Sequence, residues 1–224
     1  MSADSLFDRI YSPGRDSRVA LLYESREISY QELHAATVRT AEALQALGIT
    51  DGDRVAVLLN DSPEFIASFV AIVSLGAIAV PINLALGKED QLFILRDCGA
   101  CAAIIEAQAA ETLFPISDGP QAGSLPDLKN LLVVRRHDES EPFSIPGMNS
   151  QVFDSAQRRP LANDFPIRGR ENAEAFILCT SGSTGEPKGA VHRQTDIFYT
   201  NGTFCREVLR LREGDRLFSS SRLP

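Results

Sequence analysis

Short apolar runs alternate with segments of helical apolar spacing along most of the chain, and this alternation constrains the fold more than any other feature. Arg54–Leu59 and Ala77–Ile82 are nearly continuous apolar runs. Between them, Pro63–Leu75 follows Ser62, a good helix cap. Nearly continuous apolar runs are typical of parallel strands that are buried on both faces. Repeated strand–helix units therefore predict an α/β fold of mostly parallel sheets with helices packed on them.

The same alternation extends in both directions from these runs. Short strands are expected at Arg18–Tyr23 and Glu27–Ser29. The capping box of Ser29 and Glu32 then opens a helix that Gly48 ends. Further along, the expected elements are helices at Glu89–Asp97 and about Asp196–Leu211, and strands at Ala102–Ile105, Leu131–Val134 and Ala175–Cys179. Arg135–Arg170 is rich in proline and charge, and we expect a loop-rich excursion there.

Charge and cysteine content narrow the possible partners and the compartment. The 224 residues carry a net charge of −8, which argues against general affinity for nucleic acid or anionic membranes. The N-terminus lacks a basic region followed by an apolar stretch, so no secretory signal is expected. Four cysteines are too few for a disulfide scaffold and fit a reducing cytosol. We therefore predict a cytoplasmic protein, in which any phosphate-bearing ligand needs a local cationic or amide-rich site.

Phe65–Leu86 has no charged residue and is long enough to span a bilayer, which takes about 20 residues. Gly76 lies in its middle, and Pro81 and Asn83 lie near its end. We interpret it as a buried helix followed by a buried strand, and we predict no membrane span.

A glycine-rich loop, Thr180–Gly189, follows the strand expected at Ala175–Cys179. Its glycines, Gly189 among them, are expected to allow positive φ and close approach to a ligand. Its backbone N–H groups, hydroxyls and the Lys188 cation could together hold a polyphosphate. The alternative is a flexible surface loop, and the spacing is not that of a Walker A loop. The residues expected to bind phosphate are Thr180, Ser181, Gly182, Ser183, Thr184, Gly185 and Lys188.

Thr180–Gly189 resembles the signature phosphate loop of the adenylate-forming superfamily, which includes acyl-CoA synthetases, firefly luciferases and adenylation domains of peptide synthetases. Many members have a histidine where this chain has Gln194. Phe204–Pro224 looks most like the benzoate–CoA ligase branch. Supporting motifs stand in the family's order at Tyr30-x-Glu32-Leu33, Gly52-Asp53-Arg54-Val55, Asn60-x-x-Pro63-Glu64 and Gly76-Ala77-x-x-Val80-Pro81-Ile82-Asn83.

The resemblance implies that residues 1–224 are the N-terminal portion of the large, AMP-binding domain, with the rest of the enzyme absent. It implies a ligase that uses ATP to convert a carboxylic acid, possibly aromatic, to an acyl-adenylate and then transfers it to coenzyme A or another thiol. The loop would grip the β- and γ-phosphates. The magnesium ligand and the catalytic residues are expected outside these residues, and exposed apolar surface could cause self-association. The alternative is a catalytically inactive nucleotide-binding or interaction module.

Two other groups of residues are interpreted as structural. Cys98 and Cys101 form a lone Cys-x-x-Cys without a second ligand pair, so no metal site is expected. His192 is the histidine near the loop, and we expect a structural or supporting role for it, because a carboxylate is already ionised at neutral pH and needs no general base.

Overall fold

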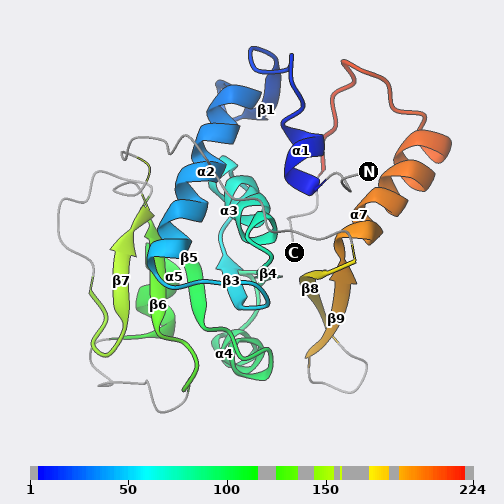
Figure 1. Ribbon diagram of the computed structural model, residues 1–224. Helices are drawn as coiled ribbons and strands as arrows, with labels where there is room; N and C mark the ends of the chain where they lie inside the picture. Colours follow the sequence, from blue (N-terminus) through cyan, green and yellow to red (C-terminus); the bar gives the residue numbers. More distant parts are fainter. Residues whose placement is uncertain are drawn as a thin grey trace.

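The computed structural model describes residues 5–115, 125–135, 144–153, 157, 172–181 and 187–219. Within them, a seven-stranded sheet has the order β7-β6-β5-β3-β4-β8-β9, and β1 and β2 form a separate hairpin (Figure 1). The strands are β1 (Val19–Tyr23), β2 (Arg26–Ser29), β3 (Arg54–Leu58), β4 (Ile78–Pro81), β5 (Ala102–Glu106), β6 (Asn130–Val134), β7 (Asn149–Val152), β8 (Glu174–Ser181) and β9 (Pro187–Arg193). The helices are α1 (Leu6–Ile10), α2 (Tyr30–Ala46), α3 (Pro63–Ser74), α4 (Lys88–Asp97), α5 (Ala107–Leu113), α7 (Gln194–Thr200) and the π-helix η3 (Asn201–Val208).

The central strands are buried because helices cover both faces of the sheet. Alternate residues of a strand point to opposite faces. Val55 and Val57 of β3 pack in one apolar cluster with α2 and α3. Ala56 and Leu58 of the same strand pack in the other cluster with α4 and α5. The predicted α/β fold of parallel strands covered by helices is therefore confirmed.

The strands that follow β3 in the chain lie on both sides of it in the sheet. β3 pairs in parallel with both β4 and β5, and β5 pairs in parallel with β6. The chain therefore moves from β3 to β4 on one side, and from β4 back over β3 to β5 on the other. In open parallel sheets, such a reversal leaves a crevice at the carboxyl ends of the strands, where ligands commonly bind.

The predicted helix starts are confirmed in atomic detail. The Ser29 hydroxyl accepts a hydrogen bond from the Glu32 N–H at 3.2 Å, and Glu32 Oε2 accepts one from the Ser29 N–H at 2.8 Å. The backbone and hydroxyl hydrogen bonds from Ser29 lower the pKa of Glu32. Ser62 caps α3 through its hydroxyl, which accepts from the Phe65 N–H at 3.2 Å. Gly48 ends α2 at φ 85°, a conformation that favours glycine.

The long uncharged stretch at Phe65–Leu86 is divided as expected, with α3 followed by β4 and a tight turn at Gly76 (φ 78°). Among the described residues, no helix has both the length and the apolar character that crossing a bilayer requires.

Two strands were not expected from the sequence. The sequence predicted a loop at Thr180–Gly189 and then a helix from about Asp196, and it did not predict β9, which pairs antiparallel with β8 from Glu174–Arg193 to Ser181–Pro187. β7 lies within the range expected to be loop-rich and pairs in parallel with β6, although most of that range is outside the described residues. The last two strands therefore pair at the edge of the sheet, and the described ends of the glycine-rich segment, Thr180–Ser181 and Pro187–Gly189, belong to this pair.

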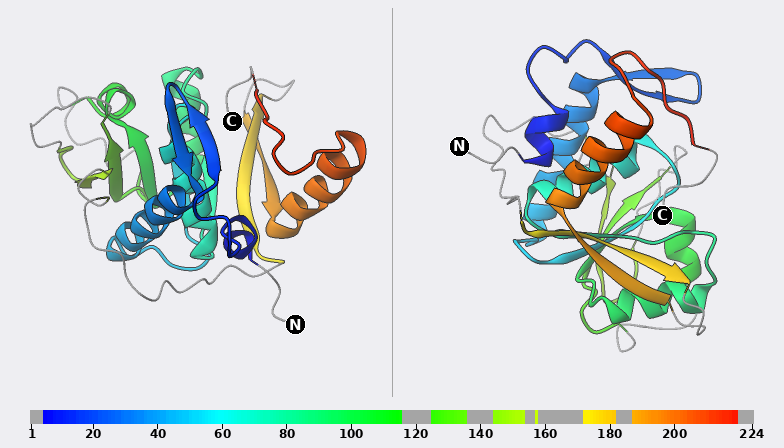
Figure 2. Two further views of the ribbon diagram at one scale, coloured as in Figure 1. Left: turned by 90° about the horizontal axis from the view of Figure 1, so that it is seen from above. Right: turned by 90° about the vertical axis from the view of Figure 1, so that its right-hand side faces the viewer.

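The helix expected at about Asp196–Leu211 is present as α7 followed without a break by η3. Figure 2 shows this helical segment standing beside the β8–β9 hairpin and projecting away from the rest of the sheet. We call residues 194–219 the helical arm, and the sheet from β7 to β4 with its helices the sheet body.

Candidate phosphate-binding hairpin

The β8–β9 hairpin brings together two of the residues predicted to bind phosphate. Thr180 is the register partner of Lys188, and both residues are exposed. Directly opposed side chains on one face of an antiparallel pair lie about 5 Å apart at Cβ. The hydroxyl and the ammonium group can therefore reach the same anion.

The other predicted phosphate ligands are placed only in part. The Ser181 backbone ends β8, opposite Pro187, and its side chain is outside the described residues. Gly182, Ser183, Thr184 and Gly185 also lie outside the described residues. Their proposed contacts with phosphate therefore remain predictions.

Gly189 has a different role from the one expected. It lies inside β9 and is not among the glycines with positive φ. A Cβ atom at this position would lie 2.8 Å from Cγ2 of Ile177 and 3.9 Å from Sγ of Cys179. The expectation of positive φ at Gly189 was wrong: glycine is needed here because β9 crosses closely over the side chain of Ile177.

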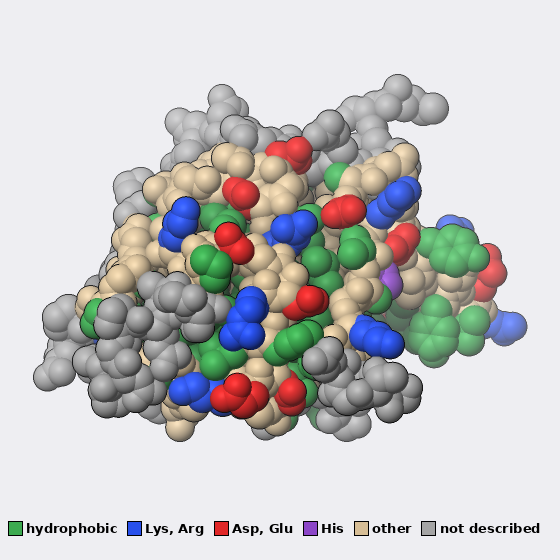
Figure 3. Space-filling model, turned by 90° about the horizontal axis from the view of Figure 1, so that it is seen from below, with side chains coloured by type: hydrophobic (Ala, Val, Ile, Leu, Met, Phe, Trp, Pro, Cys, Tyr) green, Lys and Arg blue, Asp and Glu red, His purple; other side chains and the backbone are tan. Residues whose placement is uncertain are grey.

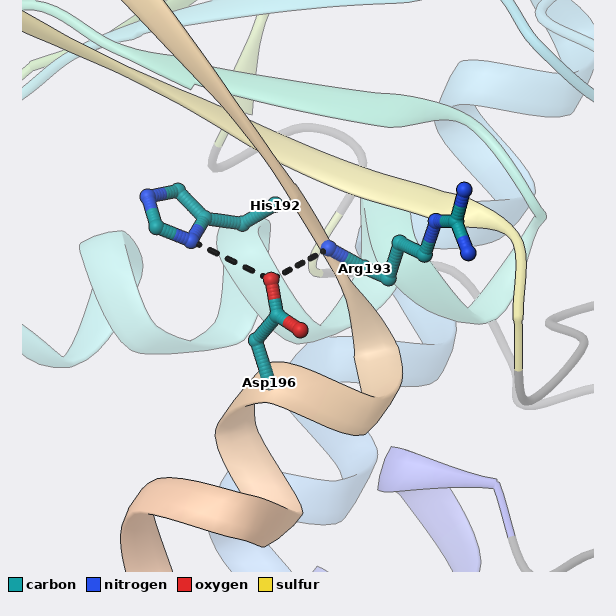
Figure 4. A network of polar contacts seen from close by, with 3 residues as sticks. All are labelled: His192, Arg193 and Asp196. Carbon is teal, nitrogen blue, oxygen red and sulfur yellow. Dashed lines mark hydrogen bonds and ion pairs between the residues drawn. The ribbon is translucent and has the colours of Figure 1, made fainter.

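A network of polar contacts fixes the junction between β9 and α7 (Figure 4). Asp196 Oδ2 accepts a hydrogen bond from the Arg193 N–H at 3.1 Å and lies 3.3 Å from His192 Nδ1. The imidazole of His192 stacks on the ring of Phe176, with centroids 4.7 Å apart and planes 10° from parallel. Phe176 in turn contacts Phe69 of α3. These contacts tie the hairpin to the sheet body and give His192 a structural role.

Gln194 is buried and connects α7 to α1 near the N-terminus. Its Oε1 accepts a hydrogen bond from the Leu6 N–H at 3.3 Å. Its own N–H donates to the Ala173 carbonyl oxygen at 3.3 Å. The amide therefore holds α1 against the start of α7. No local pattern indicates this contact, since it joins residues that are far apart in the sequence.

The cysteines have the surroundings of small apolar residues. Burial raises the pKa of the Cys98 thiol to about 11, and burial also raises the pKa of the Cys101 and Cys179 thiols. Thiols that stay protonated at neutral pH are poor metal ligands. In the part of the chain that the structure describes, no three His, Cys, Asp or Glu residues gather in a way that could hold a metal ion.

A cavity of about 590 Å³ lies at the carboxyl ends of β3, β5 and β6, near the reversal of the strand order. The buried Glu106 carboxylate accepts hydrogen bonds there from the Asn60 N–H (3.1 Å) and Nδ2 (3.3 Å). Among the described residues of the β8–β9 hairpin, none lines this cavity, so Thr180 and Lys188 lie outside it. Sequence motifs included Asn60 but did not suggest its pairing with Glu106.

Known proteins match this arrangement over nearly the whole chain. A family model described as AMP-binding enzyme matches residues 12–223. Benzoate–CoA ligase of Thauera aromatica is 30% identical over 223 residues, covering 99% of this chain and 39% of that protein. The 3-hydroxybenzoate–CoA/4-hydroxybenzoate–CoA ligase of the same organism is 31% identical over 222 residues, covering 99% of this chain and 40% of that protein.

A solved structure shows the same fold. The crystal structure of an anthranilate CoA ligase in complex with anthranoyl-AMP aligns with a TM-score of 0.80 and 30% identity, covering 94% of this chain and 39% of that one. The chain therefore spans about two fifths of the length of the relatives it matches.

Proposed function

Because this chain belongs to the AMP-binding enzyme family, we propose that it supplies the phosphate-gripping part of an ATP-dependent carboxylic acid–CoA ligase. In this proposal the carboxylate attacks the α-phosphate of ATP, which forms an acyl-adenylate and releases pyrophosphate. The thiol of coenzyme A then takes the acyl group and releases AMP. This order makes chemical sense, because a free carboxylate is a poor electrophile and AMP is a good leaving group.

The observation that carries the proposal is the pairing of Thr180 with Lys188 at the base of the glycine-rich turn. The chain has a net charge of −8, so a polyphosphate needs a local cation to offset the overall repulsion. Lys188 supplies that cation, and Thr180 supplies a hydroxyl donor beside it. Both are exposed near the end of a paired hairpin, which suits groups that hold charge developing on a leaving pyrophosphate.

The cofactors follow from the same proposal. ATP and coenzyme A are the co-substrates, and Mg²⁺ is expected to share the phosphate charge with Lys188. Thr180, Ser181, Gly182, Ser183, Thr184, Gly185 and Lys188 are the proposed phosphate contacts. The magnesium ligand and the catalytic residues are expected on polypeptide beyond these residues.

An aromatic acid is the proposed substrate class. The similar proteins include ligases for benzoate, for 3- and 4-hydroxybenzoate, and for anthranilate. Fatty-acid ligases also match, at 32% identity over 85% of this chain, so the family alone does not decide the acid. The share of the relatives that the chain covers, about two fifths, also supports a second candidate: a nucleotide-binding or interaction module without ligase activity.

A fusion protein tests the proposal. This chain would replace the matched part of the Thauera aromatica benzoate–CoA ligase, and benzoate-dependent exchange of labelled pyrophosphate into ATP would be measured. We expect exchange, and we expect Lys188→Ala to lower it roughly 30- to 150-fold, because one charge-assisted contact is worth about 2–3 kcal/mol.

Lys129→Ala is the matched control, since Lys129 is an exposed lysine outside the hairpin. It should leave exchange unchanged. Equal exchange in the Lys188→Ala and Lys129→Ala proteins would remove Lys188 from the site. A folded fusion without any exchange would favour the inactive module.

A further inference from the structure

The helical arm leaves large apolar side chains uncovered. Tyr199 is 74% exposed and Phe218 is 94% exposed. Figure 3 shows apolar side chains gathered, with charged ones between them, on the part that projects at the right of the view. The exposed apolar residues of the arm are Tyr199, Phe204, Val208, Leu209, Leu217 and Phe218.

Among the described residues, side-chain contacts hold the arm near its two ends. Near its start, the Arg9 guanidinium lies over the Phe198 ring, 4.0 Å from the ring centroid. Near its end, Glu213 forms an ion pair with Arg18. Between these anchors, η3 has no buried residue. The apolar side chains of η3 are therefore exposed to solvent.

A helix with so many exposed apolar side chains is expected to pack against another protein surface. α7 (7 residues) and η3 (8 residues) together only reach the length of about 12–15 residues below which isolated helices are marginally stable in water. The six exposed apolar side chains together offer on the order of 700 Å². A standard protein interface buries about 800 Å² on each partner. The arm therefore has the size and character of an uncovered protein interface.

The charges of the arm exclude some partners. Arg206, Glu207, Arg210, Arg212 and Glu213 place both signs among the apolar residues. Nucleic acid or an anionic membrane would need a surface of predominantly positive charge. A protein surface with its own apolar centre and mixed charges fits better.

The similar proteins indicate which protein surface the arm contacts. The family match runs from residue 12 to residue 223, through the whole arm, but the chain covers only 39–40% of the curated relatives. We propose that the helical arm is the surface on which this segment packs against the rest of an AMP-binding enzyme, the polypeptide that the relatives carry beyond the matched part. This inference rests on family membership and fold, and does not depend on the proposed ligase chemistry.

Hydrogen exchange of backbone amides tests this directly. In the chain alone, at concentrations where sedimentation shows a monomer, amides of Phe204–Leu209 should exchange at nearly the rate of an unstructured peptide. Amides of β5 should be slowed at least about 1,000-fold in the same sample. In the fusion with the remainder of the Thauera aromatica ligase, amides of Phe204–Leu209 should become protected by about 100-fold or more.

Matched variants separate docking from general folding. A double variant, Phe204→Glu with Val208→Glu, should remove the protection of the arm in the fusion and leave β5 protected. Leu22→Glu changes a residue of similar exposure (53%, against 51% for Phe204) on β1, and it should leave the arm protected.

Three results would overturn the proposal. Protected amides of the helical arm in the monomeric chain would show that no partner is needed. This measurement does not depend on whether the fusion folds. Protection that appears only as the chain dimerises would make a second copy the occupant. A folded fusion with unprotected arm amides would place the docking surface elsewhere.

Discussion

The sheet body and the helical arm differ in where their apolar side chains lie. Every residue of β5 is buried, and so are all those of β4. In η3 none is buried, although Phe204 and Val208 are as apolar as the residues of the core. The apolar side chains of these central strands are thus buried within this chain, whereas those of η3 are not.

The hairpin that carries the predicted phosphate contacts joins these two regions. β8 pairs with β4 of the body on one side and with β9 on the other. α7 then carries the chain from β9 into the arm. Thr180 and Lys188 lie near the turn end of the hairpin, whereas α7 begins at its other end, next to the Glu174–Arg193 pair (Figure 1), so a phosphate held there would lie away from the arm.

The largest expected effect comes from opening the core of the body. Ile72 of α3 is fully buried, and Ile72→Ala should lower the free energy of unfolding by about 2–5 kcal/mol, through lost burial and a cavity. Val208→Ala in the arm should change it by less than about 0.5 kcal/mol, since Val208 is exposed. Urea titrations of both variants measure the difference. Comparable losses would mean that the arm is already packed in this chain.

Two glycines sharpen the comparison, because the same substitution should act with opposite sign. Gly189→Ala forces Ile177 or the strand to move and should destabilise the protein by about 1–3 kcal/mol. Gly202 in η3 has nothing within 4 Å of a Cβ, so Gly202→Ala should stabilise the helix by up to about 1 kcal/mol. Thermal melts of both variants in the fusion protein, in which the arm is expected to be packed, give the signs. A tolerated Gly189→Ala would contradict the close crossing of β9 over Ile177.

A smaller effect concerns α1, which touches both regions. His34 of α2 packs against Phe7 and Tyr11 of α1, with ring centroids 5.2 and 5.0 Å away. Burial lowers the pKa of His34, against the opposing charge of Asp16. The unfolded chain therefore binds the proton more tightly. The stability contributed by neutral His34 is complete above a pH of about 6.5, the unfolded value, and is lost as the pH falls below it.

His34→Phe should accordingly flatten the pH dependence of unfolding between pH 7 and pH 5. Chemical denaturation at several pH values would measure it. An unchanged slope would show that α1 does not bury this imidazole.

The body was predictable from the sequence because its elements are defined by local signals. Buried parallel strands such as β3 and β4 read as apolar runs, and Ser29 and Ser62 mark the helix starts through side chains that act within one turn. β9 was missed because Pro187–Arg193 has neither an apolar run nor strict alternation, and it becomes a strand only by pairing with β8. β7 (Asn149–Val152) was missed for the same reason, as a polar strand at the sheet edge.

The candidate site was predictable in composition but not in geometry. The spacing of Thr180–Gly189 identified Thr180 and Lys188, whereas their side-by-side placement follows from the register of a hairpin that was not expected. The true constraint on Gly189 is a contact with Ile177, and no local pattern encodes it. The hydrogen bond between the Leu6 N–H and Gln194 joins α1 to α7, which are far apart in the sequence, and it could not be predicted from a local pattern either.

Acid-dependent release of AMP is the most direct test of the claim that this chain carries the phosphate grip of a site completed by further polypeptide. The chain and its fusion with the remainder of the Thauera aromatica ligase would each be mixed with ATP, magnesium, coenzyme A and a panel of aromatic and aliphatic acids. Because positioning dominates such catalysis, a partial site should lose nearly all of it. We predict AMP release by the fusion, strongly reduced by Lys188→Ala, and none by the chain alone above its own Lys188→Ala control. Acid-dependent AMP release by the chain alone would contradict the account.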